Sequence, residues 1–333
     1  QEPVPPGELK LPLTLKKLGY ATGGFGKWGL GGVGTTGDPN DQGMDRFFGY
    51  NDQAIAHNFY PTSLWNNRER VPLRNAAFAA NQKLPDGADP KNPASYASFT
   101  GTDYAPDFIN EAARKFLRDH QDRPFFLYLP HTFPHTPLFA SERFKGKSSR
   151  GIYGDVLAEL DWNVGELLKA LKDNSVADNT LVFFTSDNGP WTLMGTETGG
   201  SAGLLKDGKG STWEGGMRVP GIAWWPGKIK PGVTDNVATM LDLYPTATKL
   251  AGAKTPSDRP MDGTDLSPLL LEERAVDRGL FCYYRGEKLY AARLGDWKIH
   301  FITQGSYGDN KPQVHEKPLL FNLVVDPSEA HEI

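Results

Sequence analysis

The feature that most constrains the fold of this 333-residue chain is an alternation of short apolar runs and amphipathic stretches. The apolar runs at residues 125–129 and 181–184 are typical of buried strands. Between them, apolar side chains recur at the three- and four-residue steps of one helix face: Val156, Leu160, Val164, Leu167 and Leu171. A strand, a helix and a strand in this order predict a right-handed crossover and a mostly parallel sheet flanked by helices.

Two further patterns complete the predicted fold, one before the first apolar run and one near the C-terminus. A further amphipathic helix precedes the first run and places three side chains on one face: Phe108, Ala112 and Phe116. After about residue 252 a proline-punctuated loop leads into residues 289–301, which predict two strands around a Gly-Asp turn, and residues 319–323 predict another. We therefore expect an α/β core over residues 1–252 and a small, β-rich α+β subdomain over residues 253–333.

Composition and charge exclude some classes of partner. Lys plus Arg total 36 against 40 for Asp plus Glu, so no basic excess is present to hold a nucleic acid. The apolar runs are far shorter than the roughly 20 residues of a membrane-spanning helix. Residues 1–6 carry neither the basic nor the apolar region of a signal peptide, and a lone Cys282 forms no internal disulfide.

Polar residues follow each predicted strand, at the sheet edge where ligands of open α/β folds bind. Lys27 follows a strand near the N-terminus, His135 follows the run at residues 125–129, and Asp187 and Asn188 follow the next run. A cation, imidazoles and a carboxylate–amide pair at one rim suit an anionic substrate and a hard cation with oxygen ligands.

The same residues also fit structural roles. Residues 187–190, Asp-Asn-Gly-Pro, fit a turn, because Asn and Gly accept positive φ and Pro stops a strand. His131 and His135 stand four apart, but the neighbouring prolines exclude a helical metal-binding pair, which leaves structural histidines as an alternative. Lys27, among glycines, also fits a solvated loop.

Residues 203–210 nearly match a phosphate-binding loop. Gly210 stands where Ser or Thr would hold magnesium, and no strand runs into the first glycine, so a nucleotide-binding loop is rejected. Lys209 nevertheless lies in a flexible glycine setting, where backbone and side chain can both approach an anion.

Several segments form recognisable blocks in order along nearly the whole chain: residues 19–28, 124–137, 184–189, 208–218, 283–286 and 319–327. Together they resemble the lysine, histidine, metal and second lysine blocks of the type I sulfatases, the arylsulfatase and N-acetylgalactosamine-6-sulfatase group. The resemblance implies an alkaline-phosphatase-like α/β core and the hydrolysis of sulfate esters.

In that family a formylglycine, made from Cys or Ser, attacks sulfur as its hydrate. By position, the resemblance implies that Asp187 and Asn188 bind Ca²⁺, that Lys27 and Lys209 contact sulfate, and that His135 protonates the leaving oxygen. The chemistry is coherent, because a sulfate ester develops charge on its leaving oxygen that fixed cations and a proton donor stabilise.

Two departures from the family pattern stand out. Gly29 occupies a position where the commoner block has His, and His57 is the candidate substitute for substrate binding, with a structural role equally open. No Cys-x-Pro-Ser-Arg motif or paired aspartates precede Lys27, and Cys282 lies in a different context. As written, the chain is expected to lack its nucleophile and part of its metal ligands, and to be inactive unless an N-terminal segment restores them.

The sequence therefore predicts a sulfuric ester hydrolase for a sulfated small molecule or glycan, either a sulfated sugar or an aryl sulfate. The alternatives are an inactive sulfate-ester-binding protein and a phosphoester hydrolase, which would need two metals. Family resemblance implies a periplasmic, secreted or lysosomal location. The charge balance and the short apolar runs predict no nucleic-acid partner and no membrane span.

Overall fold

The chain is described by a computed structural model over residues 3–5, 7–77, 84–89, 92–193, 199–254, 256–307 and 310–333. It divides into two compact units. The first unit comprises Gln1–Thr180 and Ala247–Pro260, and the second comprises Leu181–Thr246 and Met261–Ile333. The boundary expected between residues 252 and 253 stays a prediction.

Sheet A of the first unit is mixed. Its strand order is β4 (Glu69–Pro72), β3 (Ser63–Asn66), β2 (Arg46–Tyr50), β1 (Ala21–Lys27) and β5 (Phe125–Tyr128). The central strand β1 pairs in parallel with β2 and β5, whereas the β2–β3 and β3–β4 pairings are antiparallel. The parallel part is thus the part that carries Lys27 at its carboxyl end.

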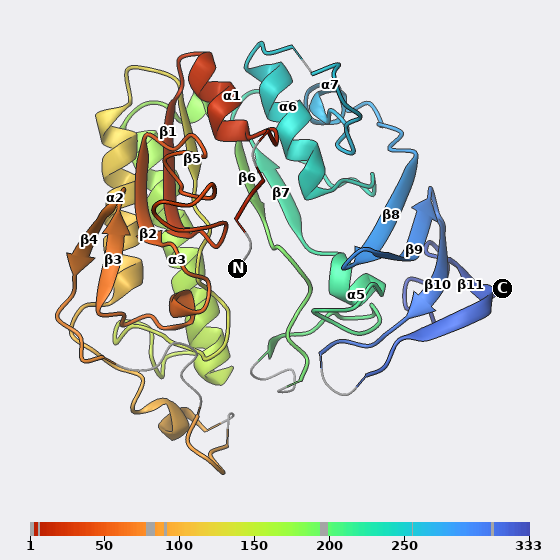
Figure 1. Cartoon of the computed structure of the whole chain (residues 1–333), viewed down its shortest axis with the longest axis horizontal. Helices are drawn as coiled ribbons and strands as arrows, with labels where there is room; N and C mark the ends of the chain where they lie inside the picture. Colours follow the sequence, from red (N-terminus) through yellow and green to blue (C-terminus); the bar gives the residue numbers. More distant parts are fainter. Residues whose placement is uncertain are drawn as a thin grey trace. The chain divides into compact units, whose positions relative to one another are not determined.

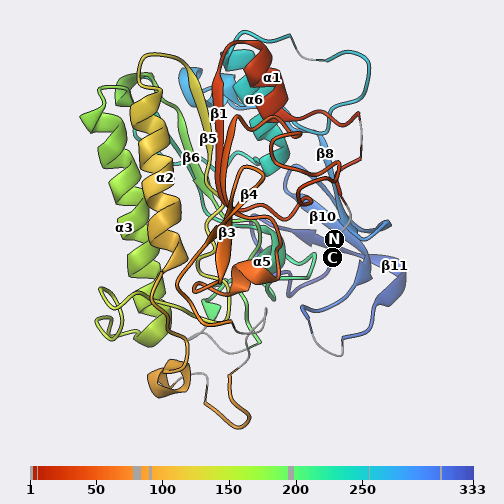
Figure 2. The same cartoon turned by 60° about the vertical axis from the view of Figure 1, so that its left-hand side comes forward.

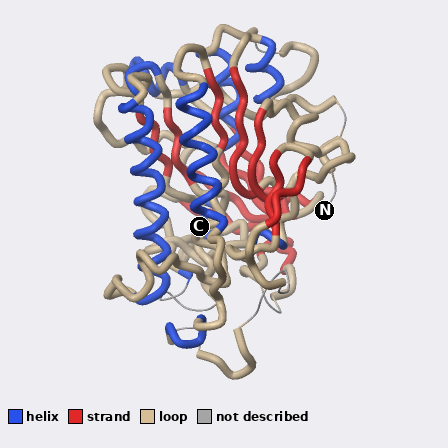
Figure 3. The backbone as a smooth tube through the Cα atoms, turned by 90° about the vertical axis from the view of Figure 1, so that its left-hand side faces the viewer, coloured by secondary structure: helices blue, strands red, loops and turns tan. Residues whose placement is uncertain are grey.

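Helices cover one face of this sheet (Figures 2 and 3). The elements of the unit outside the sheet are α1 (Leu11–Lys17), η1 (Ile55–His57), η2 (Pro93–Tyr96), α2 (Ala105–Asp119), α3 (Gly151–Asp173) and η3 (Ala177–Asn179). On α2, Ile109, Ala113 and Phe116 are buried against Phe25 of β1. The predicted face of α2 is slightly rotated, because Phe108 is 40% exposed.

The long helix α3 buries polar groups beside its apolar stripe. Val156 and Leu171 are buried as predicted. Asp155, Glu159 and Asn163 are buried as well, at four-residue steps along the same helix. Periodicity of apolar residues cannot reveal such a face, because the partners of these polar groups lie outside the helix. Asp155 accepts from the amides of residues 146–148, Glu159 accepts from Ser141 and Tyr104, and Asn163 accepts from Asn110.

The second unit holds two antiparallel sheets (Figure 1). In one, β6 (Val182–Thr185) pairs with β7 (Gly221–Trp224). The described pairing of β6 is thus antiparallel, whereas the strand–helix–strand pattern favoured a parallel one. The unit also contains α5 (Glu214–Met217), η4 (Met240–Asp242) and α7 (Ser267–Glu272), and α6 (Leu243–Leu250) includes the passage of the chain back to the first unit.

Sheet C has the order β11 (Gln313–Asn322), β10 (Trp297–Thr303), β9 (Lys288–Leu294) and β8 (Leu280–Arg285). All of its pairings are antiparallel. The two strands predicted around the Gly-Asp turn are confirmed as β9 and β10, with Gly295 at φ +56° between them. Over the described part of the chain, no helix is long and apolar enough to span a membrane.

Candidate active site

Lys27 lies at the end of β1, where the backbone of another segment comes very close. Its amide N–H donates to the carbonyl of Pro130, 2.9 Å away. The preceding residue, Gly26, has φ +127°, and a Cβ atom there would lie 2.2 Å from the same carbonyl oxygen. Only glycine fits this approach, so the sequence of β1 itself brings Lys27 to the segment that carries His135.

Lys27, His57 and His135 form a contact cluster in the first unit. The ammonium nitrogen of Lys27 lies 3.4 Å from Nε2 of His57. The rings of His57 and His135 stack with centroids 3.9 Å apart and planes inclined by 7°. An ammonium group can only donate, so Nε2 of His57 accepts and carries no proton in this arrangement. The structure thus brings together three residues that the sequence singled out separately.

Hydrogen bonding also orients His135. Its Nδ1 lies 2.6 Å from the carbonyl oxygen of Thr136, which can only accept. Nδ1 therefore carries a proton, and Nε2 is the nitrogen that gains or releases one. By contrast, burial lowers the pKa of His131 to about 4, so that ring is neutral at physiological pH.

An aromatic cluster fixes the backbone on both sides of the stacked rings. Phe59 follows His57 by two residues, and Phe133 and Phe139 flank His135. The ring of Phe59 lies 5.1 Å from that of Phe133 and 5.0 Å from that of Phe139, and all three are buried. The backbone on either side of both imidazoles is therefore held by apolar packing of neighbouring residues.

In the second unit, the loop after β6 is joined to the loop that carries Lys209. The amide of Gly189 donates to the carbonyl of Gly216, and the amide of Lys209 donates to the carbonyl of Pro190, both at 2.9 Å. A Cβ atom at Gly189 would lie 1.8 Å from the carbonyl oxygen of Gly215. The Asp-Asn-Gly-Pro segment bends at Asp187 and Asn188, but neither Asn188 nor Gly189 adopts the positive φ that the turn prediction assumed. The segment places Asp187 near Lys209.

Burial and charge act in opposite directions on Lys209. Burial lowers the pKa of its half-buried ammonium group, and the negative charge of Asp187 opposes that shift. A partly desolvated cation gains more from an anionic ligand than a fully hydrated one does. The setting of Lys209 therefore suits an anion.

Asp187 and Asn188 offer oxygen ligands for a cation. The Asp187 carboxylate is exposed. The amide nitrogen of Asn188 donates to the carbonyl of Gly189 at 2.9 Å, which makes Oδ1 its ligand atom. These donors fit Ca²⁺, which takes six to eight oxygen ligands. Among the described residues no group of three or more His, Cys, Asp or Glu side chains gathers around a common point, so the pair supplies part of a ligand set.

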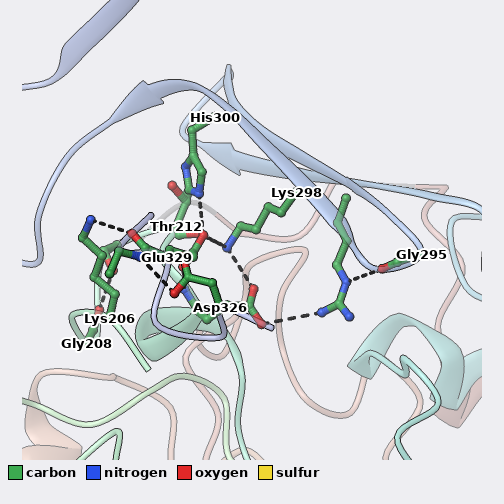
Figure 4. Close-up of polar contacts among 12 residues, drawn as sticks. Lys206, Gly208, Thr212, Gly295, Lys298, His300, Asp326 and Glu329 are labelled. Atoms are coloured by element: carbon green, nitrogen blue, oxygen red, sulfur yellow. Dashed lines mark hydrogen bonds and ion pairs between the residues drawn. The ribbon is translucent and has the colours of Figure 1, made fainter. Parts of the chain in front are cut away.

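A buried ionic network contacts Thr212 and Glu214, which follow Lys209 in the chain (Figure 4). Lys298 of β10 is fully buried, and its ammonium group donates to the Thr212 carbonyl at 2.8 Å and to Glu214 Oε1 at 2.9 Å. Arg293 lies 3.5 Å from the same carboxylate. Sequence reasoning did not find this network, because two β-strands of sheet C supply cations to Glu214, which lies 84 residues before Lys298.

Two aromatic side chains next to Lys209 were also missed. A Cβ atom at Gly210 would lie 2.9 Å from the ring of Tyr307, and that ring lies 5.6 Å from the ring of Trp191. Ser306 donates its amide to Asp207 Oδ2 at 2.9 Å, across 99 residues of sequence. No local pattern signals a contact over that distance. The contact forms because Ser306 lies in the connection between the antiparallel strands β10 and β11 of sheet C.

The fold is that of the alkaline-phosphatase-like hydrolases. The crystal structure of the PsFucS1 sulfatase from Pseudoalteromonas sp. superposes with a TM-score of 0.80 at 25% identity, covering 99% of this chain and 72% of that one. The sulfatase family profile matches residues 2–253, and the profile for the C-terminal region of aryl-sulfatase matches residues 276–333.

Named relatives agree with these profiles. Arylsulfatase A from Bos taurus is 40% identical over 99% of this chain and 68% of its own length. N-acetylgalactosamine-6-sulfatase from Homo sapiens is 37% identical over 98% of this chain and 64% of its own length. The chain belongs to the sulfatase family, whose members are sulfuric ester hydrolases.

Proposed function

We propose that the protein hydrolyses sulfate esters, and that Lys27, Lys209 and His135 act on the ester. The observation that carries the proposal is the cluster in which the Lys27 ammonium contacts His57 and the His57 ring stacks on His135. It combines a fixed cation with a proton-transfer group, which meet the need to stabilise the charge that develops as a sulfate ester is cleaved.

The residues have distinct roles in this proposal. Lys27 and Lys209 neutralise charge on the sulfate oxygens. His135, with Nδ1 held by the Thr136 carbonyl, uses Nε2 to protonate the leaving oxygen. His57 accepts from Lys27 and orients its ammonium group at the substrate. A leaving group that is protonated as the bond breaks departs as a neutral alcohol rather than as a high-energy alkoxide.

Asp187 and Asn188 are proposed to hold Ca²⁺. When bound, the ion would supply positive charge that stabilises the negative charge of the sulfate group. The family's nucleophile is a formylglycine, and no Cys-x-Pro-Ser-Arg motif occurs within the 333 residues. The source of the nucleophile is therefore part of the test below.

The names of the relatives suggest the class of substrate. One relative is an arylsulfatase and another acts on a 6-sulfated N-acetylgalactosamine, so an aryl sulfate and a sulfated sugar or glycan are the proposed partners. We propose an exported protein, in the periplasm, the medium or the lysosome, because its homologues are lysosomal or secreted sulfatases.

The test uses the protein expressed from the gene together with every codon that lies in frame upstream of Gln1. Release of sulfate from an aryl sulfate and from a 6-sulfated N-acetylgalactosamine is compared with release of phosphate from the matching phosphate esters. We expect the sulfate esters to react faster. We also expect Asp187→Ala to abolish both Ca²⁺ binding and turnover, and Asp235→Ala, at an exposed position of the same unit, to preserve both.

Other outcomes select the alternatives. Faster phosphate release together with two bound metal ions per chain indicates a phosphoester hydrolase. Binding of the sulfate ester without turnover indicates a binding protein. Wild-type activity in Asp187→Ala removes Asp187 from the metal site.

A further inference from the structure

The loop that carries Lys209 is closed at its base. The amide of Gly215 donates to the carbonyl of Lys206 at 2.8 Å, so the segment between them leaves and returns at one place. Lys209 lies within this loop and belongs to no helix or strand. Its position therefore depends on what holds the two ends of the loop.

One residue near the C-terminus contacts both ends. Glu329 accepts the amide N–H of Glu214 through Oε2 at 2.6 Å. Its backbone carbonyl accepts the ammonium group of Lys206 at 3.1 Å. The Lys206 side chain also lies over the ring of Trp213, 3.7 Å from the centroid. Glu329 thus ties the first residue of the loop to the residue that ends it.

Burial and charge hold the Glu329 side chain in this position. Its side chain is fully buried, and Oε1 lies 2.6 Å from His300 Nε2 and 3.1 Å from the Lys298 ammonium group. Burial alone would raise the pKa of the Glu329 carboxyl, but His300, Lys298 and the Glu214 amide outweigh burial and hold it below its ordinary value. The carboxyl is therefore ionised at neutral pH.

The backbone around Glu329 supports the same conclusion. Glu329 has φ +49°, a left-handed conformation that costs free energy in a residue other than glycine and persists where the surroundings hold it. Asp326 holds the turn, because its carboxylate accepts the amide N–H groups of Ala330 and His331 at 2.9 and 2.8 Å. Figure 4 shows Glu329 between Lys206, Lys298 and His300.

We propose that Glu329 is a positioning residue for Lys209, which it holds in place by clamping both ends of the loop from Lys206 to Glu214. The role of this clamp in sulfate binding rests on the proposed function, whereas the clamp itself does not. The C-terminal turn is on this view part of the apparatus that presents the cation.

The test measures Lys209 directly. Competitive acetylation of the whole chain across the alkaline pH range, followed by peptide mass spectrometry, gives the titration midpoint and the limiting rate of each lysine amine. In the wild type, Lys209 is expected to titrate below an ordinary lysine, because it is partly buried.

Glu329→Gln is the main variant. An amide has one acceptor oxygen and one donor nitrogen, so it cannot accept from Glu214 on one side and from His300 and Lys298 on the other. We expect the Lys209 midpoint to rise toward about 10.4 and its limiting rate to increase several-fold. Glu159→Gln, which neutralises a buried carboxyl in the first unit, is the matched control and leaves Lys209 unchanged.

Lys206→Met tests the other end of the loop. Lys206 is exposed, so the variant should fold, and methionine keeps the length of the side chain while losing both the ammonium contact with the Trp213 ring and the bond to the Glu329 carbonyl. We expect a smaller shift of Lys209 in the same direction. If Glu329→Gln does not fold, this variant decides the question.

An unchanged Lys209 titration in folded Glu329→Gln, or in Lys206→Met where the former does not fold, overturns the proposal. Binding of an aryl sulfate separates the two claims. A shifted Lys209 with unaltered sulfate affinity rejects the role of Lys209 in sulfate binding and leaves the clamp intact. An unshifted Lys209 rejects the clamp and leaves the proposed function intact.

Discussion

Two buried glutamates, Glu159 in the first unit and Glu329 in the second, are held in opposite ways. Glu159 in the first unit accepts from the amide of Ser141 and the hydroxyl of Tyr104, within an aromatic core. Glu329 in the second unit contacts Lys298 and His300. Burial raises the pKa of Glu159 to about 7, whereas the partners of Glu329 hold its pKa below the ordinary value.

The same contrast separates the two candidate clusters. In the first unit, Lys27 ends a central strand and contacts one of two stacked histidines, and residues that neighbour these histidines in sequence pack in a buried aromatic cluster. In the second unit, Lys209 lies on an irregular loop whose ends are held by buried charges. Regular structure with apolar packing positions one cation, and an ionic network positions the other. Four changes test this difference.

The largest effect is expected for Lys298→Met. The change leaves Glu214 and Glu329 without their fully buried cation. Breaking such a pair costs about 3–5 kcal/mol, because a charge stays buried without compensation. Urea unfolding measures the loss. Lys230→Met, at an exposed pair with Glu273, should cost at most about 1 kcal/mol. Equal losses in both variants would remove the distinction between the network and a surface ion pair.

The pH dependence of Glu159 is the next effect in size. Because its pKa is raised in the folded state to about 7, its contribution to stability is full below about pH 4.5 and is lost as the pH rises through 7. Glu159→Gln removes this dependence. The stability of the wild type relative to Glu159→Gln should fall by roughly 2–3 kcal/mol between about pH 5 and about pH 8. A difference that does not vary with pH contradicts the assignment.

Gly26→Ala tests whether backbone approach positions Lys27. The new Cβ atom would lie 2.2 Å from the Pro130 carbonyl oxygen, on a backbone with φ +127°. We expect a loss of about 1–3 kcal/mol from overpacking. Because the new Cβ atom would push β1 away from Pro130, the Lys27–His57 contact should also lengthen in a crystal structure of the variant. Unchanged stability and an unchanged contact would show that the sheet does not determine the position of Lys27.

The smallest effect has the opposite sign. Gly165 lies inside α3, and a Cβ atom there would meet nothing within 4 Å. Gly165→Ala should therefore stabilise the protein by about 0.5–1 kcal/mol, through helix propensity alone. Thermal unfolding measures the gain. A loss of stability would mean that the exposed face of α3 is packed against something the structure does not describe.

Local pattern predicted the parts of the fold that depend on local physics. The strands at residues 125 and 182, helices α2 and α3, and the β9–β10 hairpin follow from apolar period and turn residues. The antiparallel pairing of β6 with β7 and the mixed character of sheet A do not follow, because strand neighbours are chosen by tertiary packing.

The candidate site divides in the same way. Lys27, His135, Asp187 and Lys209 follow from strand ends and family blocks, and the structure adds their contacts. The stacking of His57 on His135, and the clamp of Glu329 on the Lys209 loop, join segments far apart in sequence. A single sequence, without a structure, contains no signal for either of these long-range contacts.

The measurement that tests the central claim most directly is equilibrium binding of an aryl sulfate and of its unsulfated alcohol to the wild type, Lys27→Met, Lys209→Met and Lys230→Met. We expect the wild type and Lys230→Met to prefer the sulfate ester. Lys27→Met and Lys209→Met should each lose about tenfold in affinity for the ester alone, which is about 1.4 kcal/mol. Equal binding of ester and alcohol by the wild type, or full ester affinity in both site variants, would contradict the claim that these two lysines recognise sulfate.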